Sequence, residues 1–235
     1  MCRAPNEDTL WVQVWSSAQR SRKAVALPKF YETMRGRTGA STSGSSCWGV
    51  GPEIHSPPSG RTPRLDPALV GGPDWARLDR GELSDDDVIV RAEVRTGIQA
   101  ARLRVLFGTF PRALVPVDPV LELVLQARGG GNDLYVLSNL HRTSFERVRD
   151  ELGIFELFDG SVVSCEVGAA KPEPAIYRRL LGDFDLDPTV TVFVDDTQVN
   201  LDAAAEFGIR TVLFTDAASC RSRLQALEVH LTQSL

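Results

Sequence analysis

Three polar clusters follow short apolar segments in the second half of the chain: Ser138-Asn139, Lys171-Pro172, and Asp195-Asp196 with Asn200. Hydroxyl and amide groups hydrogen-bond phosphoryl oxygens, and a lysine offsets the charge of a nucleophile and a phosphate held together. Paired carboxylates suit a hard cation such as Mg²⁺, which takes oxygen ligands and keeps water molecules beside a phosphate. These residue types indicate phosphate and magnesium chemistry.

Each cluster also has a purely structural interpretation. A Ser-Asn pair after a strand is common in turns and helix caps, and Lys-Pro often stands before a helix with the lysine solvated. The acid pair before Thr197 suits the cap of a following helix. What favours chemistry is that all three clusters occur together, in this order, each at the end of a predicted strand.

The elements that must position these clusters alternate along the chain. Apolar segments predict strands, and periodic segments between them predict helices. The predicted strands are 134–138, 161–164, 190–195 and 211–214, and the helices that follow them are 142–152, 173–181, 198–207 and 218–227. Apolar strands that alternate with helices indicate a parallel sheet covered on both faces, an α/β Rossmann-like three-layer fold. Ligands of such sheets bind beyond the carboxyl ends of the strands, where the three clusters fall.

A small helical segment precedes this sheet. Ser84 is followed by three aspartates, a capping-box pattern that predicts a helix over 88–95 ending at Gly97. A second helix is predicted over 100–110, and Asp118-Pro119 begins a third with one apolar face.

The N-terminal region differs in composition from the rest. Nineteen of the twenty-nine residues from Gly36 to Arg64 are Gly, Ser, Thr or Pro, which predicts an irregular or partly disordered segment. Residues 1–64 carry a charge balance of +5 and the remaining residues a balance of −10. An alternative hypothesis is that this region derives from a shifted reading frame or a mis-set start. Sequencing the transcript would test it, and an intact frame would exclude it.

Composition restricts the class of protein. The net charge of −5 argues against nucleic acid as a partner. No apolar run approaches the length of about 18 residues that a membrane span needs, and no secretory signal is evident. The four widely spaced cysteines suit free thiols in a reducing compartment, so a cytoplasmic protein is expected. The sequence carries no signal for an oligomeric state.

The motifs resemble the haloacid dehalogenase (HAD)-like hydrolase superfamily. The resemblance is carried by LYVLSN, EVGAAKPEPAIY and VFVDDTQVN, and it covers about residues 73–228. These strings are similar to a branch with a small helical cap, which includes sugar-phosphate phosphatases and the N-terminal phosphatase domain of soluble epoxide hydrolases. The resemblance implies three regions: an irregular region at 1–72, a helical cap at 73–116 and a HAD-like core at 117–235.

The resemblance also implies an activity and a site. The activity would be Mg²⁺-dependent hydrolysis of a small phosphorylated metabolite through an aspartyl-phosphate. Lys171 would be catalytic, and Gly168 would supply the turn before it. The implied binding residues are Ser138, Asn139 and Lys171 for the phosphoryl group, and Asp196, Asp195 and Asn200 for Mg²⁺.

One motif of the family is absent from the sequence. Its first strand ends in Asp-x-Asp, whose first aspartate is the nucleophile, but the only aspartates before Pro73 are Asp8 and Asp66. Neither follows an apolar strand. We expect 10–15 to occupy the position of the first strand. If 24–27 does so instead, Pro28 and Lys29 stand where the acids belong. Two hypotheses therefore remain: an active phosphatase, or a catalytically inactive relative that serves as a binding or interaction module.

Two other activities are disfavoured. A phosphoacceptor receiver domain has its acid pair early and its lysine last, the reverse of the order here. Haloacid dehalogenation needs no Mg²⁺, so the acid pair argues against it. Three cap residues, Trp75, Arg77 and Arg80, are left outside the predicted site because exposed cap arginines are usually solvated, and His141 is interpreted as a capping or surface residue.

Overall fold

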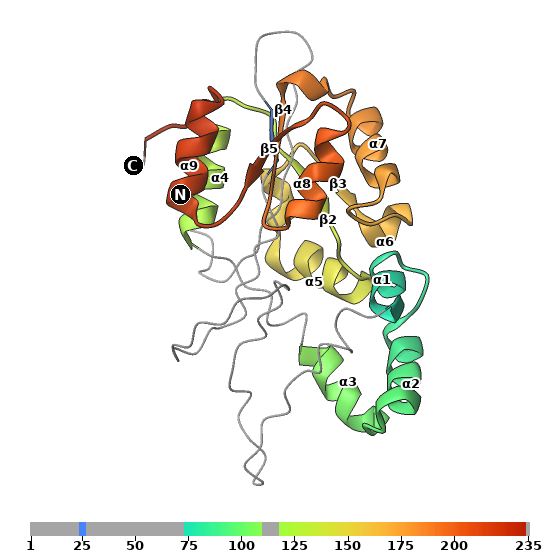
Figure 1. Cartoon of the computed structure of the whole chain (residues 1–235). Coiled ribbons are helices and arrows are strands. Elements are labelled where there is room, and N and C mark those ends of the chain that lie inside the picture. The colour runs from blue at the N-terminus through green and yellow to red at the C-terminus, as the bar shows by residue number, and fades with distance from the viewer. Residues whose placement is uncertain (1–23, 27–72, 110–117, 234–235) are drawn as a thin grey trace, which may run out of the picture.

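The computed structural model describes residues 24–26, 73–109 and 118–233 (Figure 1). Within these ranges, parallel strands alternate with helices, which confirms the α/β Rossmann-like fold. None of the described helices is long and apolar enough to cross a membrane.

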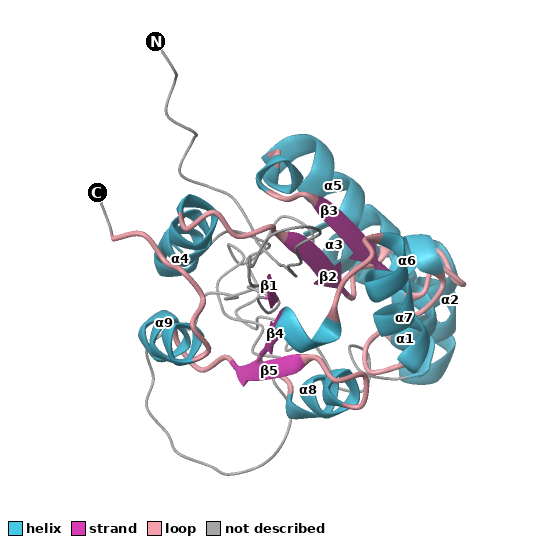
Figure 2. Ribbon diagram, turned by 90° about the horizontal axis from the view of Figure 1, so that it is seen from above, coloured by secondary structure: helices cyan, strands magenta, loops and turns pink. Residues whose placement is uncertain are grey.

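Every strand pair is parallel. The strands are β1 (Ala24–Ala26), β2 (Tyr135–Ser138), β3 (Gly160–Val163), β4 (Thr191–Asp195) and β5 (Arg210–Leu213). Strand β4 pairs with β1 on one side and β5 on the other, and β2 pairs with β3. Because β1 also contacts β2, it lies between the two groups of strands (Figure 2).

The identity of β1 corrects one expectation. The sequence suggested 10–15 for the strand beside β4, but Ala24–Ala26 pairs there, with Ala24 opposite Thr191 and Ala26 opposite Phe193. Residues 10–15 lie outside the described residues. Ala24–Ala26 falls within 24–27, the alternative that the sequence offered; three small or β-branched residues give only a weak strand signal, so their pairing with the apolar β4 depends on tertiary contacts.

Helices cover both faces of the sheet. One face is covered by α4 (Asp118–Gly129), α5 (Arg142–Leu152) and α9 (Ala217–Ala226), and the other by α7 (Pro174–Asp183) and α8 (Gln198–Ala205) (Figure 2). Side chains alternate along β4. Val192 and Val194 therefore pack with α4, α5 and α9 on one face, while Phe193 packs with α7 and α8 on the other. Three short helices complete the core region: η2 (Ile154–Leu157), α6 (Ser164–Val167) and η3 (Pro188–Val190).

Residues 73–109, here called the helical unit, form a separate small cluster. It consists of α1 (Pro73–Asp79), α2 (Asp85–Thr96) and α3 (Ala100–Thr109), which share an apolar core of their own. The predicted capping box is confirmed: Asp87 N donates to Ser84 Oγ at 3.2 Å, and Ser84 N donates to Asp87 Oδ2 at 2.9 Å. The helix ends at Gly97, as predicted, with φ 71°.

The helical unit rests on the core beside α6. Helix α1 contacts α6. At Gly81, with φ +72°, an added Cβ would lie 2.8 Å from the Cys165 backbone oxygen. Thr143 Oγ1 donates to Asp85 Oδ2 at 2.8 Å. The unit therefore meets the core near the start of α5 and at α6.

Candidate active site

The predicted polar clusters converge at the carboxyl-terminal edge of the sheet. Ser138 is the last residue of β2, Asp195 is the last residue of β4, and Lys171 lies in the loop between α6 and α7. Because the strands are parallel, their carboxyl ends share one edge, and direct contacts between these segments confirm that they are brought together.

A buried ion pair lies at the centre of the site. Lys171 Nζ donates to Asp195 Oδ2 at 2.7 Å, and each side chain is only 1% exposed. The ammonium also lies 5.4 Å from the centre of the Phe193 ring. Among the described residues, Asp195 is the only hydrogen-bond acceptor of Lys171 Nζ, so the ammonium retains donor capacity for a ligand.

Asp195 is held as a carboxylate from both sides. Its Oδ1 accepts from Thr197 N at 2.9 Å and from Asn200 Nδ2 at 3.0 Å, while Oδ2 accepts from Lys171. Burial alone would raise the pKa of the Asp195 carboxyl, but the Lys171 ammonium and the two other donors, Asn200 and Thr197, together hold its pKa below the usual range. Asp195 therefore keeps its charge and fixes the lysine side chain.

The side chain of Asn139 lies on the backbone of Lys171. Lys171 N donates to Asn139 Oδ1 at 2.8 Å, and Asn139 Nδ2 donates to Lys171 O at 2.9 Å. The sequence indicated a phosphate contact for this amide. In the structure both ends of the amide bind the lysine loop, so the residue after β2 sets the position of the lysine backbone.

The hydroxyl of Ser138, unlike the Asn139 amide, has no hydrogen-bond partner among the described residues. Ser138 is also fully buried. A buried hydroxyl without a partner costs free energy of about 1–3 kcal/mol. A ligand that supplies an acceptor here would remove this cost, which suits a phosphoryl oxygen.

The turn after β2 is fixed by residues that the sequence did not single out. Leu140 N donates to Ser164 Oγ at 3.0 Å, and Arg142 Nη2 donates to Cys165 O at 2.7 Å. Ser164 is buried at the end of a predicted strand. Its polar side chain in that apolar position was the only sign in the sequence that it helps to hold the site. These contacts hold Ser138 and its neighbours against α6.

The residues at the end of β4 fit a magnesium ion. Asp196 is half-buried, and its Oδ1 accepts from Thr197 Oγ1 at 3.1 Å. Among the described residues, no three His, Cys, Asp or Glu side chains are grouped to hold a metal by themselves. Mg²⁺ typically binds one or two carboxylates together with water and phosphate, so a single carboxylate at this edge is compatible with it. Asn200 directs its amide to Asp195 instead.

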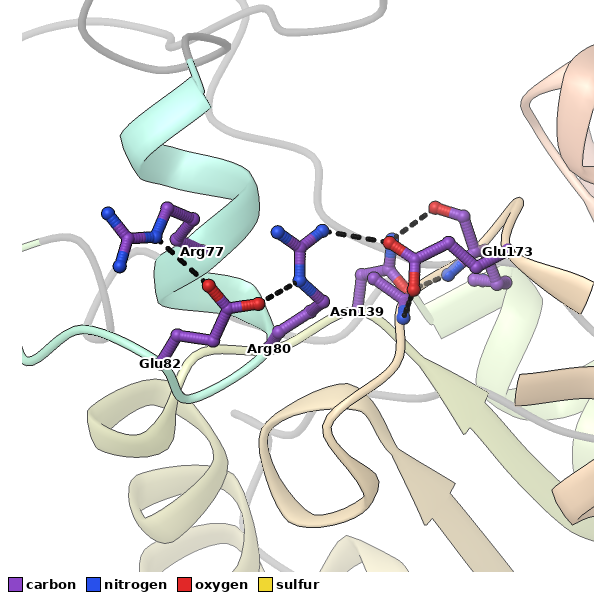
Figure 3. A network of polar contacts seen from close by, with 7 residues as sticks. Arg77, Arg80, Glu82, Asn139 and Glu173 are labelled. Carbon is purple, nitrogen blue, oxygen red and sulfur yellow. Dashed lines mark hydrogen bonds and ion pairs between the residues drawn. The ribbon is translucent and has the colours of Figure 1, made fainter. Parts of the chain in front are cut away.

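The helical unit reaches the lysine loop through an ion pair (Figure 3). Arg80 Nη1 donates to Glu173 Oε1 at 2.8 Å, and Glu173 Oε2 accepts from Ala170 N at 3.3 Å. Trp75 contacts the His141 ring edge-on at 5.6 Å between centroids, and His141 is buried, with its Nε2 2.9 Å from Ser144 Oγ. Arg80 and Trp75 therefore form part of the contact between the unit and the core.

Comparisons with known proteins agree on one family. A family model described as haloacid dehalogenase-like hydrolase matches residues 11–208. The chain is 25% identical to the sesquiterpene phosphatase astK of Aspergillus oryzae over 159 residues, which cover 68% of this chain and 81% of that protein. It is 41% identical to bifunctional epoxide hydrolase 2 of Mus musculus over 113 residues, which cover 46% of this chain but only 20% of that protein.

Solved structures show the same fold. A HAD family enzyme of Bacteroides thetaiotaomicron superposes with a TM-score of 0.53 at 22% identity, covering 68% of this chain and 80% of that chain. The same enzyme was also solved in complex with magnesium and inorganic phosphate, and that structure superposes with a TM-score of 0.51, covering 62% of this chain and 76% of that chain.

Proposed function

The chain belongs to the haloacid dehalogenase-like hydrolases, and from that premise we propose that it is a Mg²⁺-dependent phosphatase of a small phosphorylated metabolite. The observation that carries the proposal is the buried Lys171–Asp195 pair beside Ser138, whose buried hydroxyl has no partner among the described residues. Together they offer a cation and a hydroxyl donor at one edge of the sheet. An anion such as a phosphoryl group complements both.

Each residue has a proposed role. The Ser138 hydroxyl donates to a phosphoryl oxygen, and Lys171 uses its remaining N–H groups to offset charge that develops on the phosphoryl group. Asp195 keeps the ammonium aimed at that position, and Asn139 holds the lysine backbone. Removing Lys171 is therefore expected to abolish both phosphate binding and turnover.

The same edge is proposed to hold the metal. Asp196 would bind Mg²⁺ directly. Asp195 and Asn200, which are hydrogen-bonded to each other, would support the metal site without both binding the ion directly. When bound, the ion would offset the charge of the phosphoryl oxygens. We also propose that the helical unit is the cap of the family, because it has its own core and lies against the lysine loop.

The nucleophile is the point on which the two hypotheses divide. Strand β1 ends at Ala26, and the sequence after it, Leu27-Pro28-Lys29, contains no aspartate. Turnover through an aspartyl-phosphate therefore requires a nucleophilic aspartate other than the first aspartate of the family's Asp-x-Asp. The missing Asp-x-Asp favours the second candidate, a catalytically inactive relative that still binds phosphate and Mg²⁺.

Hydrolysis and binding must be measured on the same purified chain. Hydrolysis of a generic aryl phosphate would be followed with and without Mg²⁺, beside Asp196→Ala and Ser138→Ala variants. Binding of inorganic phosphate with Mg²⁺ would be measured by calorimetry. Turnover that depends on Mg²⁺ and is lost in Asp196→Ala supports the phosphatase, and trapping the phosphoenzyme would then identify the nucleophile.

The remaining outcomes separate the alternatives. Binding that needs Ser138 and Asp196 but leads to no turnover supports the inactive relative. Neither binding nor turnover, from a chain shown to be folded, would exclude both. Two substrates would be added once turnover is seen: a phosphorylated sugar, which the motif resemblance implies, and a phosphorylated sesquiterpene alcohol, because one relative is a sesquiterpene phosphatase.

A further inference from the structure

The loop that carries Lys171 is held from the helical unit as well as from the sheet (Figure 3). Glu173, the residue before α7, uses one carboxylate oxygen to accept from Ala170 N at 3.3 Å and the other to accept from Arg80 at 2.8 Å. Glu173 N also donates to Ala170 O at 2.7 Å. Residues 170–173 therefore form one compact turn, with Lys171 inside it and Arg80 at its outer side.

Arg80 is itself fixed in place before it reaches Glu173. Helix α1 ends in a left-handed Gly81, where Gly81 N donates to Leu78 O and Glu82 N donates to Arg77 O, both at 2.9 Å. This pattern is a Schellman motif, which locks the turn that carries Arg80. The Arg80 side chain is only 23% exposed, and its Nε donates to Glu82 Oε1 at 2.5 Å. Little side-chain entropy remains to be lost when it binds Glu173.

We infer that Arg80 is a positioning residue of the site: through Glu173 it holds the turn that presents Lys171, so that the seated helical unit sets the position of the lysine. The role assigned to Lys171 rests on the proposed function, whereas the coupling itself rests on these contacts alone. Glu173 is two residues from Lys171, and a shift of its carboxylate moves the Ala170 backbone on the other side of the lysine.

The inference predicts a local effect and not a global one. The side chain of Glu173 is 41% exposed, and ion pairs with that exposure contribute little to the stability of the whole protein. Loss of Arg80 should therefore leave thermal unfolding nearly unchanged while it loosens the turn. A residue with a merely structural role would show the opposite pattern.

Hydrogen exchange in the full chain tests the coupling directly. Mass spectrometry of a peptide that covers 168–175 would compare Arg80→Ala with Arg77→Ala. Arg77 is a matched control: it pairs with the same Glu82 at 3.0 Å, and that ion pair, its only one among the described residues, lies within the helical unit. Arg80→Ala should speed exchange in this peptide by about two- to fivefold, and Arg77→Ala should leave it unchanged. Equal exchange in the two variants would overturn the inference.

A double variant tests the route through Glu173. If Arg80 acts only by way of this carboxylate, Arg80→Ala combined with Glu173→Ala should exchange no faster than Glu173→Ala alone, because the two residues act as a unit. Glu173→Gln keeps an acceptor for Ala170 N and should lie between the parent and Glu173→Ala. Additive effects of the two alanine substitutions would exclude Glu173 as the intermediary.

Kinetics supply a second readout that separates the inference from the proposed function. In an active chain, Arg80→Ala should lower kcat for the aryl phosphate by about 3- to 10-fold, because a displaced ammonium offsets less of the charge that develops in the transition state. Arg77→Ala should leave kcat unchanged, and an equal loss in both variants would contradict the inference. If the parent shows no turnover, the phosphatase proposal fails, and hydrogen exchange alone decides the coupling.

Discussion

Lys171 is restrained at both ends of the residue. Its backbone N–H and C=O are bound by the Asn139 amide, and its ammonium is bound by Asp195, so neither end must reorganise when an anion arrives. Groups that are already oriented toward a developing charge stabilise it without a reorganisation cost. The restraint has a consequence for stability, because removing either charge leaves the other buried alone.

Substitution of one member of the buried pair should be strongly destabilising. Lys171→Met or Asp195→Asn is expected to lower the free energy of unfolding by about 3–5 kcal/mol, because an uncompensated buried charge remains or must be neutralised. The double variant should lose much less than the sum of the two. Urea denaturation measures each value.

A surface pair on α7 provides the control for this prediction. Arg179 and Asp183 form an ion pair of the same length range, 2.8 Å, but their side chains are 56% and 36% exposed. Arg179→Ala should therefore cost only about 0.5 kcal/mol. Similar losses in the free energy of unfolding for the Arg179 and Lys171 variants would show that burial does not determine how much an ion pair stabilises this protein.

The buried thiols predict how stability changes with pH. Burial raises the pKa of Cys165 to about 11 and that of Cys220 to about 12. In the unfolded chain these thiols lose their protons near pH 8.5, about the ordinary value. Between these values the unfolded chain binds fewer protons than the folded one, so the free energy of unfolding falls as the pH rises.

Cysteine replacement isolates this contribution. We expect the loss of stability between about pH 7 and about pH 10 to be smaller in Cys220→Ala than in the parent, as measured by urea denaturation at each pH. An identical pH dependence in the two proteins would show that this thiol does not contribute.

The sequence allowed the main residues of the site to be predicted but not all of their partners. Ser138 and Asp195 were singled out because motif and strand end coincide, and Lys171 because it belongs to the same ordered set of motifs, although it lies in the loop between α6 and α7; the structure brings the three segments together. The partners of Asn139 and Arg80 were missed. Each binds a residue far along the chain, 32 and 93 positions away, and no local pattern specifies such a contact.

At the scale of the element, the helices and strands after Ser84 follow the predicted pattern closely, whereas β1 does not. Strong periodicity, capping residues and terminal glycines define the former locally. Strand β1 has three residues, and its position is defined by pairing with β4. Helix α1 and the short α6 were also not predicted as helices; α1 packs on α2 and α6, and α6 packs on β3, α7 and α1, contacts that no local pattern specifies.

Two glycines allow the contact between helical unit and core to be measured. Gly81 and Gly97 have nearly equal φ, 72° and 71°, but an added Cβ would meet the Cys165 backbone oxygen at 2.8 Å only at Gly81, with nothing within 4 Å at Gly97. Gly97→Ala should cost about 1 kcal/mol from its left-handed backbone. Gly81→Ala should cost at least about 1 kcal/mol more, because the backbone of α6 must shift.

Thermal or urea unfolding of the two variants provides the comparison. Equal losses of unfolding free energy in the two variants would mean that the helical unit is not in tight contact with α6 at Gly81. A larger loss at Gly81 together with faster exchange near Lys171 would connect the seating of the unit to the site.

At the scale of the whole molecule, ligand binding should appear as added stability. Phosphate with Mg²⁺, at about ten times its Kd, is expected to add about 1.4 kcal/mol. For a chain of this size that corresponds to a rise in Tm of about 3–6 °C. Differential scanning calorimetry measures it, and the result does not depend on turnover.

The Asp196→Ala variant tells whether the metal takes part. The rise in Tm with phosphate should lose its dependence on Mg²⁺ in this variant and should vanish in Ser138→Ala combined with Lys171→Met. A rise that still depends on Mg²⁺ in Asp196→Ala would place the cation elsewhere. Both the active and the inactive hypotheses require this binding, so it is the common test of the site.

The position of β1 also has a consequence for how the chain folds. Its partners in β4 lie more than 160 residues later in the sequence, so the central pairing closes a very long loop. Closing long loops is slow, and folds rich in distant contacts cross a higher barrier. During synthesis, β2 and β3 can pair early, whereas β1 must wait until β4 has left the ribosome. We therefore expect the pairing of β1 with β4 to be a late step of folding, so that the site at the end of β4, which holds the Lys171–Asp195 pair, forms late as well.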